Sequence, residues 1–201
     1  MGPRENLIQE ILDMELRMFL SVVPKEPVSC QQDPEGFRVM RSAQFSVWSE
    51  QTLVSYREDL QKAFAEERNL MTLKYARMDN LIPKLHDNIM VENLIDEIVA
   101  IQVEWQRERM ARYPHLMKRG RPLEREGKTT ETTSFVDYLR SELETYSAGT
   151  LARLYEDLTE GQSKDENLIE QIYSHMLKGL GFSSIDEAEE AAKATGQTDL
   201  M

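Results

Sequence analysis

The sequence predicts an all-α fold, a single compact globule of seven or eight helices with one long central helix. In a chain of 201 residues only nine are glycine and seven are proline, which leaves little room for the many turns of an all-β fold. Apolar residues recur at helical spacing in one segment after another, and no segment is clearly a strand. Helices packed around one core are therefore expected.

The first two helices have clear boundaries in the sequence. One helix is expected from about Arg4 to Leu20, and the prolines at positions 24 and 27 prevent it from continuing. Asp33 followed by Pro34 marks the next start, because aspartate is a preferred N-cap and proline is favoured in the first helical turn. The segment between these helices is predicted to be extended.

The middle of the chain contains the longest periodic run. The second helix either runs on or breaks near Ser49 and restarts, ending near Arg68, and NLMTLKYARM forms a short element after it. The run from Asn88 to Tyr113 is predicted to be the central helix, because its apolar residues form one broad stripe. That stripe comprises Val91, Leu94, Ile95, Ile98, Ile101 and Trp105.

The remaining segments complete a single helical domain over residues 1–195. Residues 114–133 are rich in charge, proline and glycine and are predicted to be a basic loop or arm. Three helices follow, the first capped by Ser134, and then a last helix with few apolar anchors. Residues 196–201 are expected to be a frayed tail. The sequence has no repeat of fixed period.

Composition excludes several classes of protein. The formal net charge of −12 argues against binding to nucleic acid or to anionic membranes. Cys30 is the only cysteine, so one chain can build neither a disulfide nor a thiolate zinc cluster. We expect neither a signal peptide, because charged residues interrupt the apolar residues of the first helix, nor a membrane span, because no segment has about 20 apolar residues in a row. A cytoplasmic protein is expected.

Charged residues lie on apolar helix faces in four places. Glu15 is near the centre of the apolar arc of the first helix, and Arg41 is in the middle of the arc formed by FRVMRSAQFSVW. Lys74 and Arg77 project with Leu70 in NLMTLKYARM, and Glu142 borders the stripe of SFVDYLRSELETY. An isolated buried charge costs several kcal/mol, so these groups need partners or water. We expect the partner of Arg41 to be a carboxylate on another helix.

Three arrangements satisfy this requirement. The charges pair in a structural network, or they open onto a ligand pocket, or their long side chains reach solvent. In the pocket interpretation, donors and a carboxylate line the site and two aromatic residues form its walls. The candidate ligand-binding residues are Glu15, Arg41, Gln44, Trp48, Tyr75, Arg77 and Glu142.

Motifs for catalysis or cofactor binding are absent from the sequence. A di-iron site needs two Glu-x-x-His pairs, and His86, His115 and His175 each lack a glutamate three residues earlier. We predict no metal and no cofactor. Cys30 precedes a predicted helix and has no histidine close in sequence, so an inert thiol is favoured over a catalytic one.

A basic segment offers a second candidate site for anions. Between Arg107 and Lys128 the sequence contains eight lysine or arginine residues and three glutamates. This segment either gathers a phosphate-bearing ligand or docks on the acidic surface of the protein itself. The candidate residues are Arg112, Lys118, Arg119 and Arg121.

Four segments carry a resemblance to a known family. They are SCQQDPEGFRVMRSAQFSVWSEQTL, NLMTLKYARM, EWQRERMARYPHLMKRGRP and TSFVDYLRSELETYS. Together they resemble an uncharacterised bacterial domain family, one of the numbered families of unknown function. The resemblance implies a helical protein sometimes associated with nucleotidyltransferase-like domains, and it implies no established activity or catalytic residue.

Three functional hypotheses follow. The leading one is a binding module, without chemistry of its own, for a small anionic ligand or a partner protein at the buried Arg/Gln/Glu cluster. The second is an enzyme that uses Glu15 or Glu142 as a general base whose pKa is raised by burial. The third is a purely structural or homo-oligomeric protein, marked by a buried network with no cavity beside it.

Overall fold

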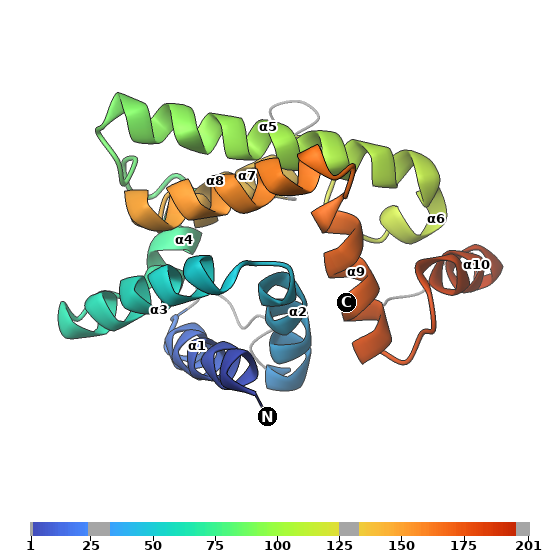
Figure 1. Ribbon diagram of the computed structural model, residues 1–201, viewed down its shortest axis with the longest axis horizontal. Helices are drawn as coiled ribbons and strands as arrows, with labels where there is room; N and C mark the ends of the chain where they lie inside the picture. Colours follow the sequence, from blue (N-terminus) through green and yellow to red (C-terminus); the bar gives the residue numbers. More distant parts are fainter. Residues whose placement is uncertain (1, 24–32, 125–132, 196–201) are drawn as a thin grey trace.

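The computed structural model describes residues 2–23, 33–124 and 133–195, and these form ten α-helices and no strand (Figure 1). The all-α class is therefore confirmed, although the helices number ten rather than seven or eight. They are α1 (Pro3–Leu20), α2 (Pro34–Ser46), α3 (Glu50–Ala65), α4 (Leu70–Met78), α5 (Ile89–Arg112), α6 (Pro114–Met117), α7 (Phe135–Leu143), α8 (Ala148–Ser163), α9 (Leu168–Gly179) and α10 (Ile185–Thr195).

Two local signals explain the additional helices. The Ser49 side chain accepts a hydrogen bond from the Thr52 backbone N–H at 3.2 Å, so α3 begins as a separate helix after α2. Pro114 occupies the first turn of α6, a four-residue helix inside the predicted basic arm. The predicted caps Asp33 and Ser134 accept hydrogen bonds from the N–H groups of Gly36 and Asp137.

Two pairs of segments show that the chain contains an internal duplication. ENLIQEIL, which starts at Glu5 in α1, matches ENLIDEIV, which starts at Glu92 in α5. SEQTLVSYREDL, from Ser49, matches SAGTLARLYEDL, from Ser147. We call α1–α4 the first repeat and α5 with α7–α9 the second repeat. A fixed period does not describe them, because α6 and the segment after it separate α5 from α7.

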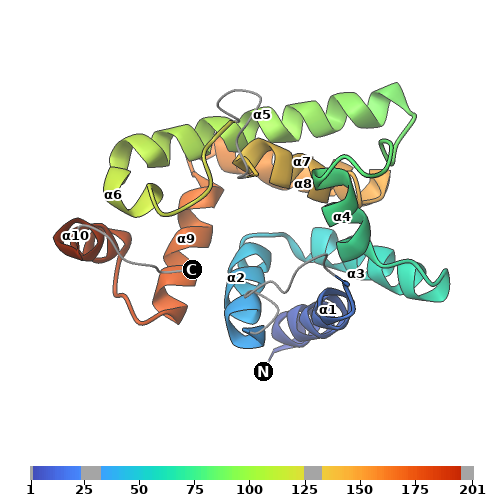
Figure 2. The same cartoon turned by 180° about the vertical axis from the view of Figure 1, so that it is seen from behind.

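Packing follows the same duplication. Helix α1 packs on α2, α3 and α4, just as α5 packs on α7, α8 and α9. Between the repeats α3 crosses α8, while α2 contacts α9 and α4 contacts α7. Helices α1 and α5 lie on opposite sides of the molecule in both views (Figures 1 and 2). Helix α5 is therefore an outer helix, and the expectation that it is central is wrong.

Equivalent hydrogen bonds join the two repeats. The Asp157 carboxylate accepts the Ser49 N–H at 2.9 Å and the Thr52 hydroxyl at 2.7 Å. The Asp59 carboxylate accepts the Ser147 N–H at 2.9 Å and the Thr150 hydroxyl at 2.7 Å. Each aspartate thus holds the start of the equivalent helix in the other repeat, which is the pattern of an approximate twofold axis between α3 and α8.

The main core draws side chains from both repeats, including Phe45, Leu60, Ile98 and Leu151. A smaller cluster lies under α6 and α10, where the Glu189 carboxylate also accepts the Leu116 N–H at 2.7 Å. Several predictions fall outside the described residues: the extended segment with Cys30, the part of the basic arm over 125–132, and the tail over 196–201.

Candidate functional site

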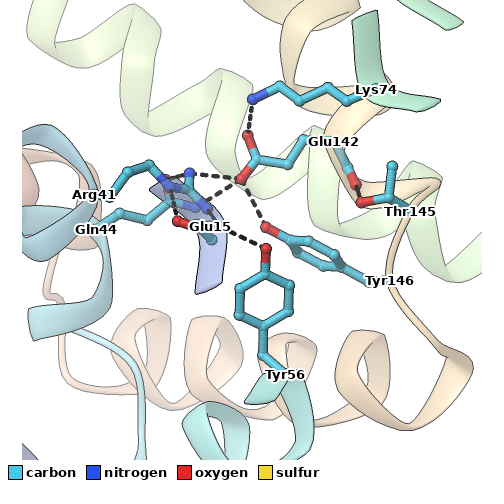
Figure 3. A network of polar contacts seen from close by, with 8 residues as sticks. All are labelled: Glu15, Arg41, Gln44, Tyr56, Lys74, Glu142, Thr145 and Tyr146. Carbon is cyan, nitrogen blue, oxygen red and sulfur yellow. Dashed lines mark hydrogen bonds and ion pairs between the residues drawn. The ribbon is translucent and has the colours of Figure 1, made fainter. Parts of the chain in front are cut away.

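Side chains from five helices meet in one buried polar group, which Figure 3 shows from close by. We call it the charge cluster. Its charged members are Glu15 of α1, Arg41 of α2, Lys74 of α4 and Glu142 of α7, and none is more than 5% exposed. Its neutral members are Gln44, Tyr56 and Tyr146. The first repeat therefore supplies most of the cluster, and α7 inserts a carboxylate from the second.

Arg41 is the centre of the charge cluster. Its Nε and Nη2 donate to the two carboxylate oxygens of Glu15 at 2.7 and 2.5 Å. Its Nη1 donates to Glu142 Oε1 at 2.7 Å and to Gln44 Oε1 at 2.6 Å. The prediction that a carboxylate on another helix pairs with Arg41 is confirmed, and every nitrogen of the guanidinium is occupied.

The remaining oxygens of the two carboxylates are also used. Lys74 Nζ donates to Glu142 Oε2 at 2.6 Å, and the Tyr146 hydroxyl donates to Glu142 Oε1 at 2.7 Å. The Tyr56 hydroxyl donates to Glu15 Oε1 at 2.5 Å. Two carboxylates thus face two cations, and the formal charges of the cluster cancel.

The electrostatics of the cluster keep its charges fixed. Burial alone would raise the pKa of the Glu142 carboxyl, but Arg41 and Lys74 hold that pKa well below its usual range. Burial would lower the pKa of Arg41, yet Glu142 and Glu15 raise it well above its usual value. Glu142 therefore has no raised pKa with which to act as a general base near neutral pH, contrary to the enzyme hypothesis for this residue.

The other residues predicted to join this site lie around it or elsewhere. Trp48 packs edge-on against the rings of Tyr56 and Tyr146, with centroids 5.6 and 6.0 Å away. Tyr75 lies against Phe19, at 6.5 Å between centroids. Arg77 belongs to a separate ion pair, in which its Nε and Nη2 donate to the Glu144 carboxylate at 2.5 and 3.1 Å.

Three of the four candidate residues of the basic arm contact other groups of the protein itself. Arg112 Nη1 donates to Glu170 Oε1 at 3.2 Å, and Arg119 Nη2 donates to the Ala192 carbonyl at 3.4 Å. The Arg121 guanidinium lies over the Tyr138 ring, 4.7 Å from its centroid, and Lys118 is exposed. Of these contacts only that of Arg112 is with an acidic group, so the choice between a ligand site and docking on the acidic surface stays a prediction.

A pocket of about 300 Å³ lies apart from the charge cluster, between α1, α2 and α9. We call it the polar pocket. Its lining contains no member of the charge cluster. The lining residues are Gln9 and Leu12 of α1, Arg38, Val39, Ser42, Ala43 and Ser46 of α2, and His175 and Gly179 of α9.

The duplication shows what is unusual about the polar pocket. When the two repeats are aligned on the matched segments, Gln9 corresponds to Asp96, and Ser42 to Arg140. In the second repeat this aspartate and this arginine form an ion pair. This ion-paired aspartate and arginine are thus replaced in the first repeat by an amide and a small hydroxyl.

The other polar positions of the pocket follow the same rule. Ser46 corresponds to Glu144, and His175 corresponds to Arg77. Glu144 and Arg77 form a second ion pair, at 2.5 Å. Four positions that carry two ion pairs in one half of the fold therefore carry a glutamine, two serines and a histidine in the other half. These four side chains line the hollow between α1, α2 and α9.

Two of the lining residues, Val39 and Gly179, lie where α2 and α9 pack closely. A side chain at Gly179 of α9 would place its Cβ 2.9 Å from Val39 Cγ1 of α2, so only glycine allows this approach. Within the described part of the chain, no three His, Cys, Asp or Glu residues are grouped so as to hold a metal ion. None of the helices described could cross a membrane.

Sequence reasoning missed the two buried tyrosines and the polar pocket. A buried tyrosine hydroxyl requires a hydrogen-bond acceptor. Tyr56 and Tyr146 each lie one or two helical turns from a residue of the cluster or of its core. That spacing is the signal that could have indicated these tyrosines as members of the cluster. Comparison of the matched segments would have identified Ser42 and Ser46 as small replacements for Arg140 and Glu144.

The fold defines the class of protein: an all-helical chain built from two related repeats with a buried ionic cluster between them. A family model matches residues 5–190, and the chain belongs to that family, which is described as "Protein of unknown function (DUF4125)". The predicted membership of a family of unknown function is thus confirmed. Comparisons with curated proteins and with solved structures gave no match.

Proposed function

We propose that this protein is a binding module without chemistry of its own, whose site for a small polar ligand is the polar pocket. The observation that carries the proposal is the asymmetry between the repeats. Asp96, Arg140, Glu144 and Arg77 form two ion pairs, whereas the equivalent positions at the pocket are Gln9, Ser42, Ser46 and His175. Loss of both pairs at one place in the duplicated fold favours a function for that hollow.

The charge cluster has a different role in this proposal. Arg41 uses four of its five N–H donors on Glu15, Glu142 and Gln44, so at most one is left for a ligand. Entry of an anion would have to displace a buried carboxylate that is itself paired. We therefore assign the charge cluster to structure, as a link between α1, α2, α4 and α7, and move the leading hypothesis from the cluster to the polar pocket.

The size and lining of the polar pocket fit a small ligand. A volume of about 300 Å³ is at the lower end of the usual range for ligand sites, roughly 300–1,000 Å³. Leu12, Val39 and Ala43 supply an apolar surface, and the polar groups listed above surround it. This combination of apolar walls with a few polar groups is typical of small-molecule sites. A cytoplasmic metabolite is the kind of ligand that we propose.

A filling substitution tests the proposal. A library of small polar fragments would be screened by ligand-observed NMR against the wild type and against Ser42→Leu, which fills the pocket with an apolar side chain. The control is Gln61→Leu on the exposed face of α3. We expect fragments that bind the wild type and the control but not Ser42→Leu. Equal binding to all three proteins, or no binding to the wild type, would contradict the proposal.

A further inference from the structure

We infer that the ligand of the polar pocket carries a carboxylate or phosphoryl group, that Arg38 binds this group, and that Asp13 competes with it for Arg38. The inference rests on the proposed function, because it names the chemistry of the same site. It has three supports: the charge of the lining, the weak internal partner of Arg38, and the donors placed around it.

The lining has gained positive character relative to the second repeat. Gln9 and Ser46 replace the carboxylates of Asp96 and Glu144, and Ser42 and His175 replace their partners Arg140 and Arg77, so two acids and two arginines are lost together. Arg38 stands where the second repeat has Val136, so a cation is gained. No described residue that lines the pocket is an aspartate or a glutamate. A cationic ligand would find no counter-charge on these walls, whereas an anionic ligand would find Arg38.

Arg38 is paired, but in a way that a ligand can replace. Its Nη2 donates to Asp13 Oδ1 at 2.6 Å, and the two side chains are 30% and 62% exposed. Ion pairs at this exposure are screened by water and contribute little to stability. Arg41, three helical positions away, is buried and held by two carboxylates. The same helix thus carries one arginine fixed for structure and one that can exchange its partner.

The groups around Arg38 can bind the rest of such a ligand. Ser46 donates its hydroxyl proton to the Ala43 carbonyl at 2.7 Å, so its oxygen lone pairs can accept a hydrogen bond from a ligand hydroxyl. The Ser42 hydroxyl and the Gln9 amide can donate to anionic oxygens. Guanidinium groups bind carboxylate and phosphoryl oxygens through paired N–H donors, which makes Arg38 the anchor of the anionic end.

Asp13 then acts as an internal competitor. An anion that reaches Arg38 must separate it from the Asp13 carboxylate, so the measured affinity is reduced by the stability of that pair. Removal of the competing charge frees the guanidinium. The inference therefore makes an unusual prediction, that loss of a charged side chain beside the pocket strengthens binding.

The chain offers a closely matched control. Glu10 also lies on α1 and pairs with an arginine of a neighbouring helix, Arg57, at 3.3 Å. The exposures of that pair, 59% for Glu10 and 30% for Arg57, nearly equal those of Asp13 and Arg38. Glu10 does not line the pocket. Glu10→Gln removes the same charge as Asp13→Asn without freeing Arg38.

The test is a titration followed by amide NMR shifts of the labelled protein. The probes are L-lactate and glycerol 3-phosphate as the two anionic chemistries, with glycerol as the uncharged control, at constant ionic strength. We expect both anions, but not glycerol, to shift the amides of α2 that line the pocket. Asp13→Asn should tighten anion binding several-fold, Glu10→Gln should leave it unchanged, and Arg38→Met should weaken it by about tenfold or more.

Each other outcome counts against the inference. Equal tightening by Asp13→Asn and Glu10→Gln would mean that only the overall charge matters and that Asp13 is no competitor. Binding of glycerol as strong as that of the anions, unaffected by Arg38→Met, would overturn the anionic class while the proposed function stands. If neither anion binds the wild type or Asp13→Asn at millimolar concentration, the inference falls, and the fragment screen on Ser42→Leu decides the proposed function separately.

Discussion

Replacement of Arg41 by methionine tests the structural role of the charge cluster. Methionine keeps most of the volume of the side chain but removes the cation, so Glu15 is left with only the Tyr56 hydroxyl and Glu142 with Lys74 and Tyr146. The cluster changes from neutral to one uncompensated negative charge in a site that water does not reach. Removal of one partner from a buried ion pair costs about 3–5 kcal/mol.

The assay is thermal and urea unfolding of the wild type and the variant. For a chain of this length, a loss of that size lowers Tm by about 6–20 °C. The control is Arg38→Met on the same helix, which removes an exposed pair and should cost less than about 1 kcal/mol. Adding Glu15→Gln to Arg41→Met restores neutrality, so the double variant should lose less than the sum of the two single losses. An Arg41→Met protein as stable as the wild type would refute the reasoning.

Three further predictions follow from the same structure. The pKa of Glu142 is lower in the folded protein than in the unfolded chain, where it is about 4.3. The contribution of this carboxylate to stability is therefore complete above about pH 4.3 and is lost as the pH falls below that value. Acid unfolding of Glu142→Gln should depend less on pH than acid unfolding of the wild type. Burial raises the pKa of Tyr56 and Tyr146, so in an ultraviolet titration these two tyrosines should ionise only on alkaline unfolding. Asp59→Asn and Asp157→Asn should each lower the free energy of unfolding by about 1–2 kcal/mol, and by similar amounts, because each carboxylate holds the start of the equivalent helix in the other repeat. Chemical denaturation measures both losses, and a loss in only one of the two variants would contradict the symmetry.

Arg109 provides a contrast with Arg41, and the comparison shows what the sequence could not decide. Both arginines are buried on helices, but Arg109 Nε and Nη1 have no hydrogen-bond partner within the described residues, and its guanidinium stacks on Tyr173 at 3.2 Å from the ring centroid. Burial lowers the pKa of Arg109. Helical spacing alone identified Arg41 as buried, but whether a buried cation has a carboxylate partner depends on which helix faces it.

The elements that carry their own signals were predictable. Asp33 with Pro34 and the Ser134 cap start α2 and α7 where the sequence indicates, because capping depends on residues within one helical turn. Glu15 and Arg41 were predictable as partners because each lies on an apolar face and they have opposite charge. The position of Arg77 was not, because α4 points it toward Glu144, away from the cluster.

The polar pocket depends on information that no single segment contains. Ser42 and Ser46 are ordinary on an amphipathic helix, and Gly179 looks like a helix C-terminus. Their importance appears only when α2 is seen against α9 and then compared with α7 against α4, where ion-paired side chains occupy the equivalent positions. A hollow is a property of the assembled helices, and the sequence reveals it only through the duplication.

The most direct test of the whole account is a crystal structure of the protein soaked with L-lactate and, separately, with glycerol 3-phosphate. The account predicts electron density for the anion between α1, α2 and α9, with its charged end on Arg38 and the Asp13 side chain displaced. The contacts of Arg41 with Glu15 and Glu142 should be unchanged. Density for the anion inside the charge cluster, with Arg41 separated from Glu15, would contradict the assignment of the cluster to structure and of the polar pocket to binding.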